Sequence, residues 1–384
     1  MQEFKTSDRL AGELASLDFE VIRDINKTGL VGILKNGGGP TLMIRADMDG
    51  LPVQEKTGLS YASTATQKNL ENIEMPVMHA CGHDMHVTSL VGVARQMIDL
   101  KDQWQGTLIL LGQPAEGALG GAIGMVADGL YDRVGLPDFA LALHVIAKHP
   151  AGKIAFSDGL MYSSADSVRI TVRGIAAQGA SPHLGKDLVL IGSQIVLALQ
   201  TIITREISPM EPALITVGAF RGCTAPNMIA DHAVLDITVC ANTEKTRYQL
   251  LDSIKRVALN TARAAGVPEN LLPFVVSLDG APTTSNNAAL SQRVRRAMLA
   301  GMGEDAFVDW YQSDMGAEDF PDLVNIDPRI PNVYFEIGVT PPELIEADTW
   351  ASHHSSLFQI NHVTSIKSGV EAMTLDALGL LSKG

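Results

Sequence analysis

The sequence predicts an α/β protein in which a mostly parallel sheet flanked by helices is interrupted by a smaller inserted α+β domain. Three observations support this fold class. The chain has 384 residues, which is longer than one ordinary hydrophobic core requires. Short apolar segments alternate with helical patterns toward both ends of the chain. Between these regions the strands change from continuously apolar to alternating, as in a sheet with one solvated face.

The N-terminal part indicates a first helix followed by buried strands. We expect the helix at residues 7–17. Apolar runs at 41–44, 107–112 and 139–145 lack polar alternation, which is typical of strands buried on both faces. Between the first two runs, residues 84–101 place their apolar side chains along one side of a helix. This order of strand and helix favours a parallel sheet.

The central part has a different strand pattern, beginning with the alternating segment "SVRITVRG" at 167–174. The expected elements that follow are a helix at 187–205, strands at 213–220 and 233–242, a helix at 244–265 and a strand at 274–280. The order β-α-β-β-α-β is that of a ferredoxin-like split β-α-β sandwich.

After about residue 285 the chain returns to helix and buried strand, with "NVYFEIGV" at 332–339 and a last helix at 363–381. We therefore predict one discontinuous α/β domain, formed by residues 1–165 and 281–384. An α+β lid of residues 166–280 is inserted into it.

Composition limits the class of protein. Hydrophobic residues make up 46% and charged residues 19%, which indicates a packed globular protein. A net charge of −14 argues against a nucleic-acid partner. The chain has three cysteines, Cys81, Cys223 and Cys240, and so few cysteines indicate no disulfide framework. The N-terminus does not resemble a signal peptide. We therefore expect a cytoplasmic location. The longest apolar runs fall short of the roughly 18 residues of a membrane span, so no membrane is expected.

Polar side chains follow the ends of the predicted buried strands, where sites form in open α/β sheets. Asp47 and Asp49 follow the first strand, Glu116 follows the second, and His144 lies at the end of the third. Each alone has an ordinary explanation, such as a turn residue, a helix cap or a hydrogen-bonded core histidine. Together they predict a metal site with an adjacent general base.

The segment "MHACGHDMHV" at 78–87 adds the densest group of metal-binding side chains. Cys81 and His83 are separated by one glycine, and alternate residues of an extended turn point the same way, so we expect both to be ligands. His79 and Asp84 are interpreted as supporting or helix-start residues, and His86 as a residue that faces neighbours within the fold.

Late in the chain, "WASHHSS" offers His353 and His354, which could instead be a solvated loop pair. Cys81 alone could likewise be a small buried hydrophobe. A thiolate with imidazoles suits zinc, nickel, cobalt or manganese better than calcium or magnesium.

These segments resemble those of a known family. The motifs "RADMDGLPVQE", "MHACGHDMHV", "QPAEGALGGAIGMVADG", "ALHV", "GASPHLGKD", "TAPNMIADHAVL", "MGAEDF" and "HHSSLF" occur in order along nearly the whole chain. The sequence resembles the metal-dependent aminoacylase/carboxypeptidase superfamily, in the amidohydrolase branch that contains hippurate hydrolases, N-acyl-amino-acid amidohydrolases and auxin-conjugate hydrolases. The resemblance implies a catalytic α/β domain with an inserted lid, and a homodimer or higher oligomer formed through that lid.

The resemblance also implies roles for individual residues. Cys81 would be a shared metal ligand, and His83, His144 and His353 would be imidazole ligands. Glu116 would be the general base. Apart from the resemblance, Asp84 or Asp49 could orient a histidine ligand through a hydrogen bond, and Asp49 is a candidate catalytic residue for this reason. In the lid, Asn227, His183 and Gln178 would contact the oxyanion or the substrate. The cofactor would be one or two divalent ions, with zinc or manganese favoured and nickel or cobalt as alternatives.

Two departures from the family pattern lie at expected site positions. Gly117 stands where the pattern "QPAEEG" has a second glutamate that binds metal, so a second metal site is in question. Gln178 stands where the family usually has a histidine, and glutamine cannot carry a positive charge.

The predicted function is metal-dependent hydrolysis of an amide C–N bond in an N-acyl amino acid or a similar small amide. One alternative is a family member repurposed for hydrolytic deamination of a small or aromatic amine. The other is a non-catalytic metal- or ligand-binding protein of the same fold, which would have no need of the base Glu116.

Overall fold

The computed structural model describes residues 1–69, 71–222, 225–326 and 328–382. The chain forms two compact units. The first comprises residues 1–161, 285–311 and 319–384, and the second comprises 162–284 together with 312–318. The sequence placed the insertion at 166–280, so the second unit begins four residues earlier, ends four residues later and includes a segment that the sequence analysis assigned to the catalytic domain.

The first unit is built on a seven-stranded sheet in the order β1-β2-β6-β3-β7-β17-β8. Its four central strands β6 (Gly106–Gln113), β3 (Thr41–Asp47), β7 (Phe139–Pro150) and β17 (Asn332–Thr340) are parallel. The outer strands β1 (Glu20–Ile25), β2 (Gly29–Asn36) and β8 (Ile154–Ala155) pair antiparallel, which makes the sheet mixed. Nearly every residue of β3, β6 and β17 is buried, as their continuous apolar runs predict.

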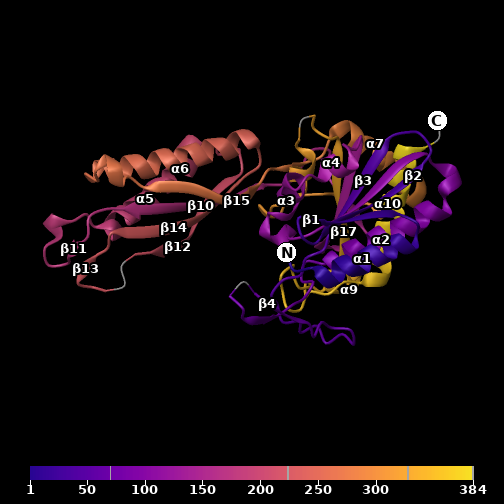
Figure 1. Cartoon of the computed structure of the whole chain (residues 1–384), viewed down its shortest axis with the longest axis horizontal. Helices are drawn as coiled ribbons and strands as arrows, with labels where there is room; N and C mark the ends of the chain where they lie inside the picture. Colours follow the sequence, from indigo (N-terminus) through magenta and orange to yellow (C-terminus); the bar gives the residue numbers. More distant parts are fainter. Residues whose placement is uncertain (70, 223–224, 327, 383–384) are drawn as a thin grey trace. The chain divides into compact units, whose positions relative to one another are not determined.

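Helices cover this sheet (Figure 1). Helix α1 (Phe4–Ser16) packs against β1 and β2, and α2 (His83–Asp99) packs against β3 and β7. The C-terminal helix α10 (His362–Leu381) contacts α2, β3 and β17. The remaining elements of this unit are α3 (Gly121–Ala127), α4 (Leu130–Val134), α7 (Ala288–Met302), α8 (Phe320–Val324), α9 (Pro342–Glu346), the hairpin β4 (Thr66–Lys68) and β5 (Glu74–Pro76), and short 3₁₀ helices at Lys101–Gln103, Glu116–Ala118 and Glu304–Ala306. Strands β9 (Leu160–Tyr162) and β16 (Thr284–Ser285) form a further two-stranded sheet.

The second unit has the predicted β-α-β-β-α-β order, with sheet order β12-β14-β10-β15 and antiparallel pairing throughout. Its elements are β10 (Ser164–Arg173), α5 (Leu188–Thr201) with a π-helical turn at Ile202–Glu206, β12 (Ala213–Arg221), β14 (His232–Ala241), α6 (Glu244–Ala264), a 3₁₀ turn at Glu269–Leu271 and β15 (Phe274–Ala281). Strand β10 alternates strictly between buried and half-buried residues, as its sequence predicts. Both helices cover one face of the sheet, and their inner side chains form the hydrophobic core of this unit (Figure 1).

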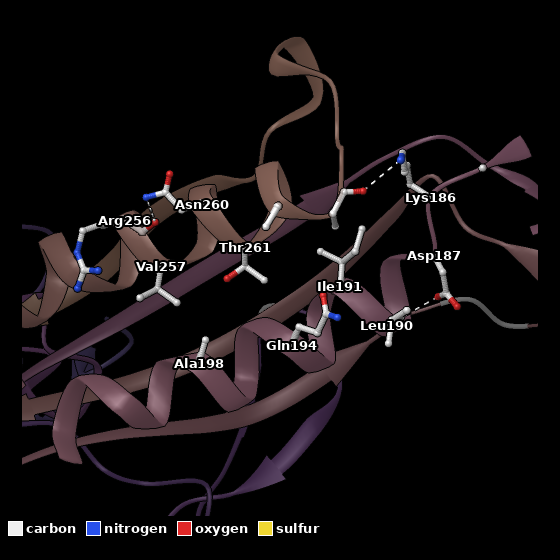
Figure 2. A pocket seen from close by; sticks show the side chains of 13 residues that line it. Lys186, Asp187, Leu190, Ile191, Gln194, Ala198, Arg256, Val257, Asn260 and Thr261 are labelled. Carbon is white, nitrogen blue, oxygen red and sulfur yellow. Dashed lines mark hydrogen bonds between the residues drawn. The ribbon is translucent and has the colours of Figure 1, made fainter. Parts of the chain in front are cut away.

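Helix caps in this unit match the sequence. The Asp187 carboxylate accepts the backbone N–H groups of Val189 and Leu190 and begins α5, and the Thr243 hydroxyl accepts the N–H of Thr246 and begins α6. Side chains of α5 and α6 that face one another line a groove of about 760 Å³ (Figure 2). Its cations are engaged within the unit, since Lys186 donates to the Ala265 carbonyl and Arg256 pairs with Glu206.

The apolar segment of α5 is longer than the run recognised in the sequence. Leu188–Glu206 spans 19 residues with a mean hydropathy of 1.6, which meets the length and composition of a membrane span. Ile191, Ile195 and Leu199 on this helix are buried in the core of the second unit. Core helices of globular proteins meet the same criterion, and this segment forms part of such a core.

Candidate metal centre and active site

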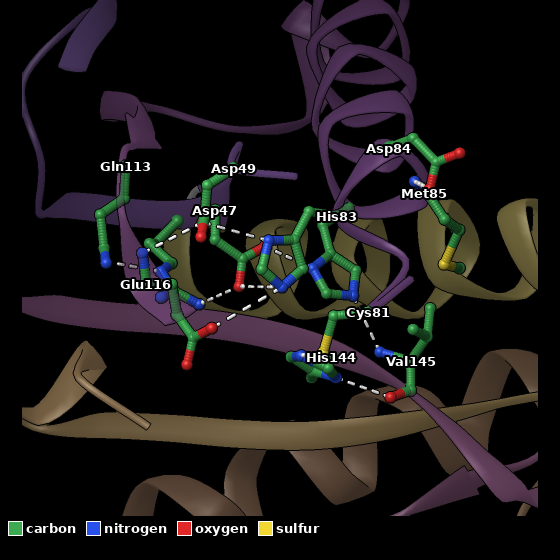
Figure 3. Close-up of polar contacts among 12 residues, drawn as sticks. Asp47, Asp49, Cys81, His83, Asp84, Met85, Gln113, Glu116, His144 and Val145 are labelled. Atoms are coloured by element: carbon green, nitrogen blue, oxygen red, sulfur yellow. Dashed lines mark hydrogen bonds and ion pairs between the residues drawn. The ribbon is translucent and has the colours of Figure 1, made fainter. Parts of the chain in front are cut away.

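The predicted site residues of the first unit converge at one edge of its sheet (Figure 3). Asp47 is the last residue of β3, and Asp49 follows it in the next turn. Glu116 opens a 3₁₀ turn after β6, and His144 lies within β7. His83 is the first residue of α2. This convergence follows from the parallel central strands, whose carboxyl ends share an edge.

Cys81 and His83 lie close to one another for a different reason from the one that the sequence suggested. The expected extended segment is absent: Cys81 lies in a turn, Gly82 has φ 77° and ψ 21°, and α2 begins at His83. Left-handed backbone suits glycine. A Cβ atom on Gly82 would also lie 2.4 Å from Cγ2 of Val145, so a close approach to β7 excludes larger residues here.

The Cys81 sulfur is surrounded by imidazoles. Its Sγ lies 3.6 Å from Nε2 of His144 and 3.5 Å from Nδ1 of His353. Burial alone would raise the pKa of the Cys81 thiol, but the His144 charge and hydrogen bonds from His144, His353 and His354 outweigh it and hold the pKa well below its usual range. Cys81 is therefore set to be a thiolate, which is the form that binds metals.

His83 faces three carboxylates. Its Nδ1 lies 3.2 Å from Oδ1 of Asp49, and its Nε2 lies 3.7 Å from both Oδ2 of Asp47 and Oε2 of Glu116 (Figure 3). His83 is buried, and neither ring nitrogen makes a hydrogen bond of good geometry to the described residues. Burial opposes charge on His83, but the charge of Asp47 and the nearby Asp49 carboxylate raise its pKa well above the ordinary value. Buried ring nitrogens without hydrogen-bond partners, surrounded by carboxylate oxygens, are suited to binding a metal cation together with those oxygens.

Asp49 is held by the loop that carries Glu116. The backbone N–H of Glu116 donates to Oδ1 of Asp49 at 3.0 Å, and that of Gly117 donates to Oδ2 at 3.1 Å. Ala115 and Leu119, which flank this turn, both have φ 49°, a left-handed conformation that is rare for residues with a side chain. Strain of this kind concentrates at functional sites.

His144 is oriented by its own backbone. Its Nδ1–H donates to the Val145 carbonyl at 2.6 Å, and this directs Nε2 at Cys81. Burial lowers the pKa of His144, but the Cys81 thiolate outweighs burial and raises it to about 9. A metal ion that replaces this proton would use the same Nε2 lone pair.

The two histidines of "SHHSS" differ. Nε2 of His353 accepts the backbone N–H of Ala147 at 3.0 Å, so a neutral His353 carries its proton on Nδ1, which faces Cys81. His354 also hydrogen-bonds the Cys81 sulfur, and that bond raises its pKa. His354 has φ 65° and donates its N–H to the Ala80 carbonyl at 2.8 Å.

Two residues at this site received little weight in the sequence. His86 and Asp47 are fully buried beside His83 and form a hydrogen bond with each other. Burial, the largest effect, lowers the pKa of His86 to about 3. The spacing of His83 and His86, three residues apart on a helix, was the available signal that both face one side.

The donor atoms fit divalent metal ions. Within the first unit, two groups bring their ligand atoms within 4.8 Å of one another: Asp47, His83, His86 and His144, and Asp49, His83 and Glu116. The Cys81 thiolate lies against His144. Sulfur, imidazole and carboxylate donors together suit zinc, manganese, cobalt or nickel.

The predicted lid residues lie in the second unit, near one another. Gln178 belongs to the short strand β11 (Ala177–Gln178), which pairs with β13 (Met228–Ile229). The N–H of Gly179 donates to the Asn227 carbonyl, and His183 lies in the 3₁₀ turn Pro182–Leu184 that follows. Gln178, His183 and Asn227 are all exposed on this unit.

A mixed α/β sheet with an inserted ferredoxin-like unit and a buried cluster of thiolate, imidazole and carboxylate groups defines a metal-dependent hydrolase. The chain belongs to peptidase family M20/M25/M40, whose model matches residues 43–375. This family contains the amidohydrolases that the sequence motifs resemble.

Relatives with assigned names agree with this class. The hippurate hydrolase of Campylobacter jejuni is 36% identical over 286 residues, covering 74% of this chain and 70% of that protein. The IAA-amino acid hydrolase ILR1-like 2 of Arabidopsis thaliana is 32% identical over 362 residues, covering 94% and 77%. A solved structure from methicillin-resistant Staphylococcus aureus has a TM-score of 0.85 at 28% identity, covering 98% of this chain and 91% of that one.

Proposed function

We propose that this protein hydrolyses the amide C–N bond of an N-acyl amino acid or a similar small amino-acid conjugate. The observation that carries the proposal is the Glu116 carboxylate, whose Oε2 lies 3.7 Å from Nε2 of His83 at the edge of the donor cluster. A base beside metal-binding groups is required for hydrolysis and is not required for binding alone. The named relatives are hydrolases of acyl amino acids and auxin–amino acid conjugates, which supports this substrate class.

A divalent ion held by these residues would polarise the scissile carbonyl and lower the pKa of the attacking water. Glu116 accepts a proton from that water and later delivers it to the leaving amine. Asp49, fixed by two backbone N–H groups, keeps the ring of His83 oriented through Nδ1. Zinc or manganese is the proposed metal, and nickel or cobalt would suit the same donors.

The number of ions depends on Gly117. A Cβ atom there would lie 3.3 Å from Oδ2 of Asp49, so the position has little room for a side chain in this arrangement. We propose that one ion binds tightly beside Cys81 and His144, and that the group Asp49, His83 and Glu116 binds a second ion more weakly. Metal analysis after gel filtration should give about one ion per chain. A stoichiometry of two would contradict the proposal.

Either His353 or His354 could supply the metal ligand from the C-terminal part of the chain. The sequence favoured His353, but the Ala147 N–H occupies Nε2 of His353 and leaves a protonated Nδ1 toward Cys81. This favours His354 as the ligand, with His353 as a hydrogen-bond donor to the thiolate. His354→Ala should then lower metal affinity more than His353→Ala. The reverse order would restore the original choice.

Activity is tested with N-acetyl, N-benzoyl and indole-acyl amino acids in the presence of zinc or manganese, by measuring amine release. Glu116→Gln should reduce turnover by about 100-fold or more, because it removes the base, and it should leave the tightly bound ion beside Cys81 and His144 in place. Glu343→Gln, an exposed glutamate in α9 of the same unit, is the matched control. Full activity of Glu116→Gln would refute the mechanism.

The roles of Asn227, His183 and Gln178 in holding substrate or oxyanion remain predictions. Removing one oxyanion donor typically costs 10²–10³ in turnover. Asn227→Ala is therefore expected to reduce kcat without a change in metal content. An unchanged kcat would remove Asn227 from the mechanism.

We also propose a homodimer formed through the second unit. Strand β12 is an edge strand, paired only with β14 among the described residues. On helix α5, Leu197 is 71% exposed and Val189 is 48% exposed, and a Cβ atom on Gly192 of this helix would lie 2.6 Å from Cζ of Phe220 on β12. An unpaired edge with an apolar border is suited to pairing with a second copy.

Sedimentation measures this association. Leu197→Glu should yield monomers, and Leu278→Glu on β15, the opposite edge of the same sheet, should leave the dimer intact. A monomeric wild-type protein would contradict the proposal. The sparse cysteines, of which Cys81 and Cys240 are free, support the proposed cytoplasmic location; Cys223 lies outside the described residues.

A further inference from the structure

A buried polar network lies beneath the donor cluster, and His86 is its central member. His86 is 1% exposed, and its ring packs against those of His83 and His144. Its ring centroid is 5.3 Å from that of His83 and 4.5 Å from that of His144. His86 was not among the predicted site residues, and the mechanism above gives it no part.

Both ring nitrogens of His86 are engaged. Nδ1 hydrogen-bonds Oδ1 of Asp47, and Nε2 accepts the backbone N–H of Val145 at 2.9 Å. Since Nε2 is the acceptor, the neutral ring carries its proton on Nδ1 and donates it to Asp47. No lone pair remains for a metal ion, although the His86 nitrogens lie within 4.8 Å of other donor atoms.

We infer that His86 is a positioning residue that fixes His83 on α2 and His144 on β7 in the relative places that metal binding requires. The inference rests on the proposed metal-dependent function. His86 holds the β7 side by its bond to the Val145 N–H, and the carbonyl of the same residue accepts the Nδ1–H of His144. Val145 is therefore clamped between the two imidazoles, and Nε2 of His144 is left directed at Cys81.

On the other side His86 holds Asp47, which is itself anchored. Oδ2 of Asp47 accepts a hydrogen bond from Nη1 of Arg45 at 2.9 Å. The same oxygen lies 3.7 Å from Nε2 of His83. Arg45 donates Nε to Oε1 of Gln113 at 2.8 Å, and Gln113 donates to Oδ1 of Asp319 at 2.6 Å. Arg45, Asp47, Gln113 and Asp319 are all buried. The network thus connects the ends of β3 and β6 to α2 through one histidine.

Two other roles for His86 make different predictions. If His86 were a ligand, its replacement would remove an ion. If it were only a packing residue, a phenylalanine of similar shape would preserve metal binding. Partners that orient ligands typically change metal affinity by 10–100-fold when they are replaced, with the ligand set intact.

The test uses the full-length protein and zinc alone, with the dissociation constant measured by competition against a chromophoric chelator. His86→Phe removes both hydrogen bonds and should weaken zinc binding by about 10–100-fold. His86→Asn can still donate to Asp47, and His86→Gln can still accept from Val145, so each should lose less. Ser89→Ala, which removes a buried hydroxyl of α2 with no hydrogen-bond partner among the described residues, should bind zinc as the wild type does.

The visible absorption spectrum of the Co²⁺-loaded protein provides a second readout. The spectrum should change in His86→Phe, because the ligands shift, and the saturating stoichiometry should not change. If His86→Phe fails to fold by circular dichroism, the Asn and Gln variants decide the question in the same assays.

Wild-type zinc affinity and an unchanged cobalt spectrum in the His86 variants would overturn the inference. Loss of one ion per chain at saturation would also overturn it, because His86 would then be a ligand. A wild-type protein that binds neither zinc nor cobalt would instead refute the proposed function, so the two failures are distinguishable.

Discussion

Gly82→Ala tests whether the backbone between Cys81 and His83 is as constrained as the structure indicates. The substitution carries two costs. A left-handed conformation for a residue with a Cβ costs about 1–2 kcal/mol, and Gly82 has φ 77°. The new methyl group would also lie 2.4 Å from Cγ2 of Val145 and 3.1 Å from Cδ1 of Ile360. Overpacking of this kind costs about 1–3 kcal/mol, for a sum of about 2–5 kcal/mol.

Two other glycines separate these costs. Gly58 has φ 74°, and a Cβ atom added to it would have no other atom within 4 Å, so Gly58→Ala isolates the backbone cost. Gly92 lies within helix α2, where its Cβ would be 2.4 Å from Cγ2 of Val370, so Gly92→Ala isolates the overlap. Alanine in a helix regains about 0.5–1 kcal/mol over glycine, which makes Gly92→Ala milder than Gly82→Ala.

Urea unfolding followed by tryptophan fluorescence is the appropriate assay. All three tryptophans, Trp104, Trp310 and Trp350, lie in the first unit, so their signal reports the unit that holds Gly82. The midpoint should fall furthest for Gly82→Ala, at unchanged slope. The same variant should bind zinc more weakly, because Cys81 and His83 would be displaced. A Gly82→Ala protein no less stable than Gly58→Ala would refute the reasoning about Val145.

Three further outcomes are expected. Asp376 is buried in α10 without a hydrogen-bond partner among the described residues, and burial raises its pKa well above 3.8. The folded protein therefore keeps a proton on Asp376 that the unfolded chain loses, so the free energy of unfolding declines as pH rises above about 4. Asp376→Asn removes this effect, and its melting temperature relative to wild type should rise between pH 5 and 8. A difference in melting temperature that does not depend on pH would contradict this. Removal of metal with EDTA should lower the urea midpoint of unfolding measured by tryptophan fluorescence, and added zinc should restore it. The reason is that a ligand which binds only the folded state stabilises that state. An unchanged midpoint would count against the metal centre. In the second unit, Arg247→Met should lower the free energy of unfolding by about 3–5 kcal/mol, because buried Asp166 loses its two hydrogen bonds of 2.8 Å to Arg247. Unfolding followed by circular dichroism measures this loss. The double variant Arg247→Met, Asp166→Leu should recover much of it, because no buried charge is left unpaired.

Much of the fold follows from local patterns. The continuous apolar runs of β3, β6 and β17 predicted burial on both faces, and the alternation in β10 predicted a sheet with one core side. The antiparallel pairing of β2 with β6 was not predicted, because pairing partners are chosen by tertiary packing and not by the strand's own sequence. The assignment of residues 312–318 to the second unit is a long-range property of the same kind.

The chemistry of the site was visible in the sequence as residue types at strand ends. Glu116, His144, Cys81 and His83 could be selected because parallel strands bring their carboxyl ends to one edge. The sequence could not show how each side chain is directed. Gly82 reverses the chain where an extended turn was expected, and the Ala147 N–H distinguishes His353 from its neighbour.

The sequence by itself determined the fold class, the family and the inventory of metal-binding groups, because these depend on periodicity and on short motifs. Only the tertiary structure decided which ring nitrogen of each histidine is directed at the other metal-binding groups. It also decided which histidine uses both of its nitrogens in hydrogen bonds. For His86 both nitrogens are used by Asp47 and Val145, partners 39 and 59 residues away in the chain. Contacts over such separations depend on how β3, β7 and α2 pack, and no local pattern records them.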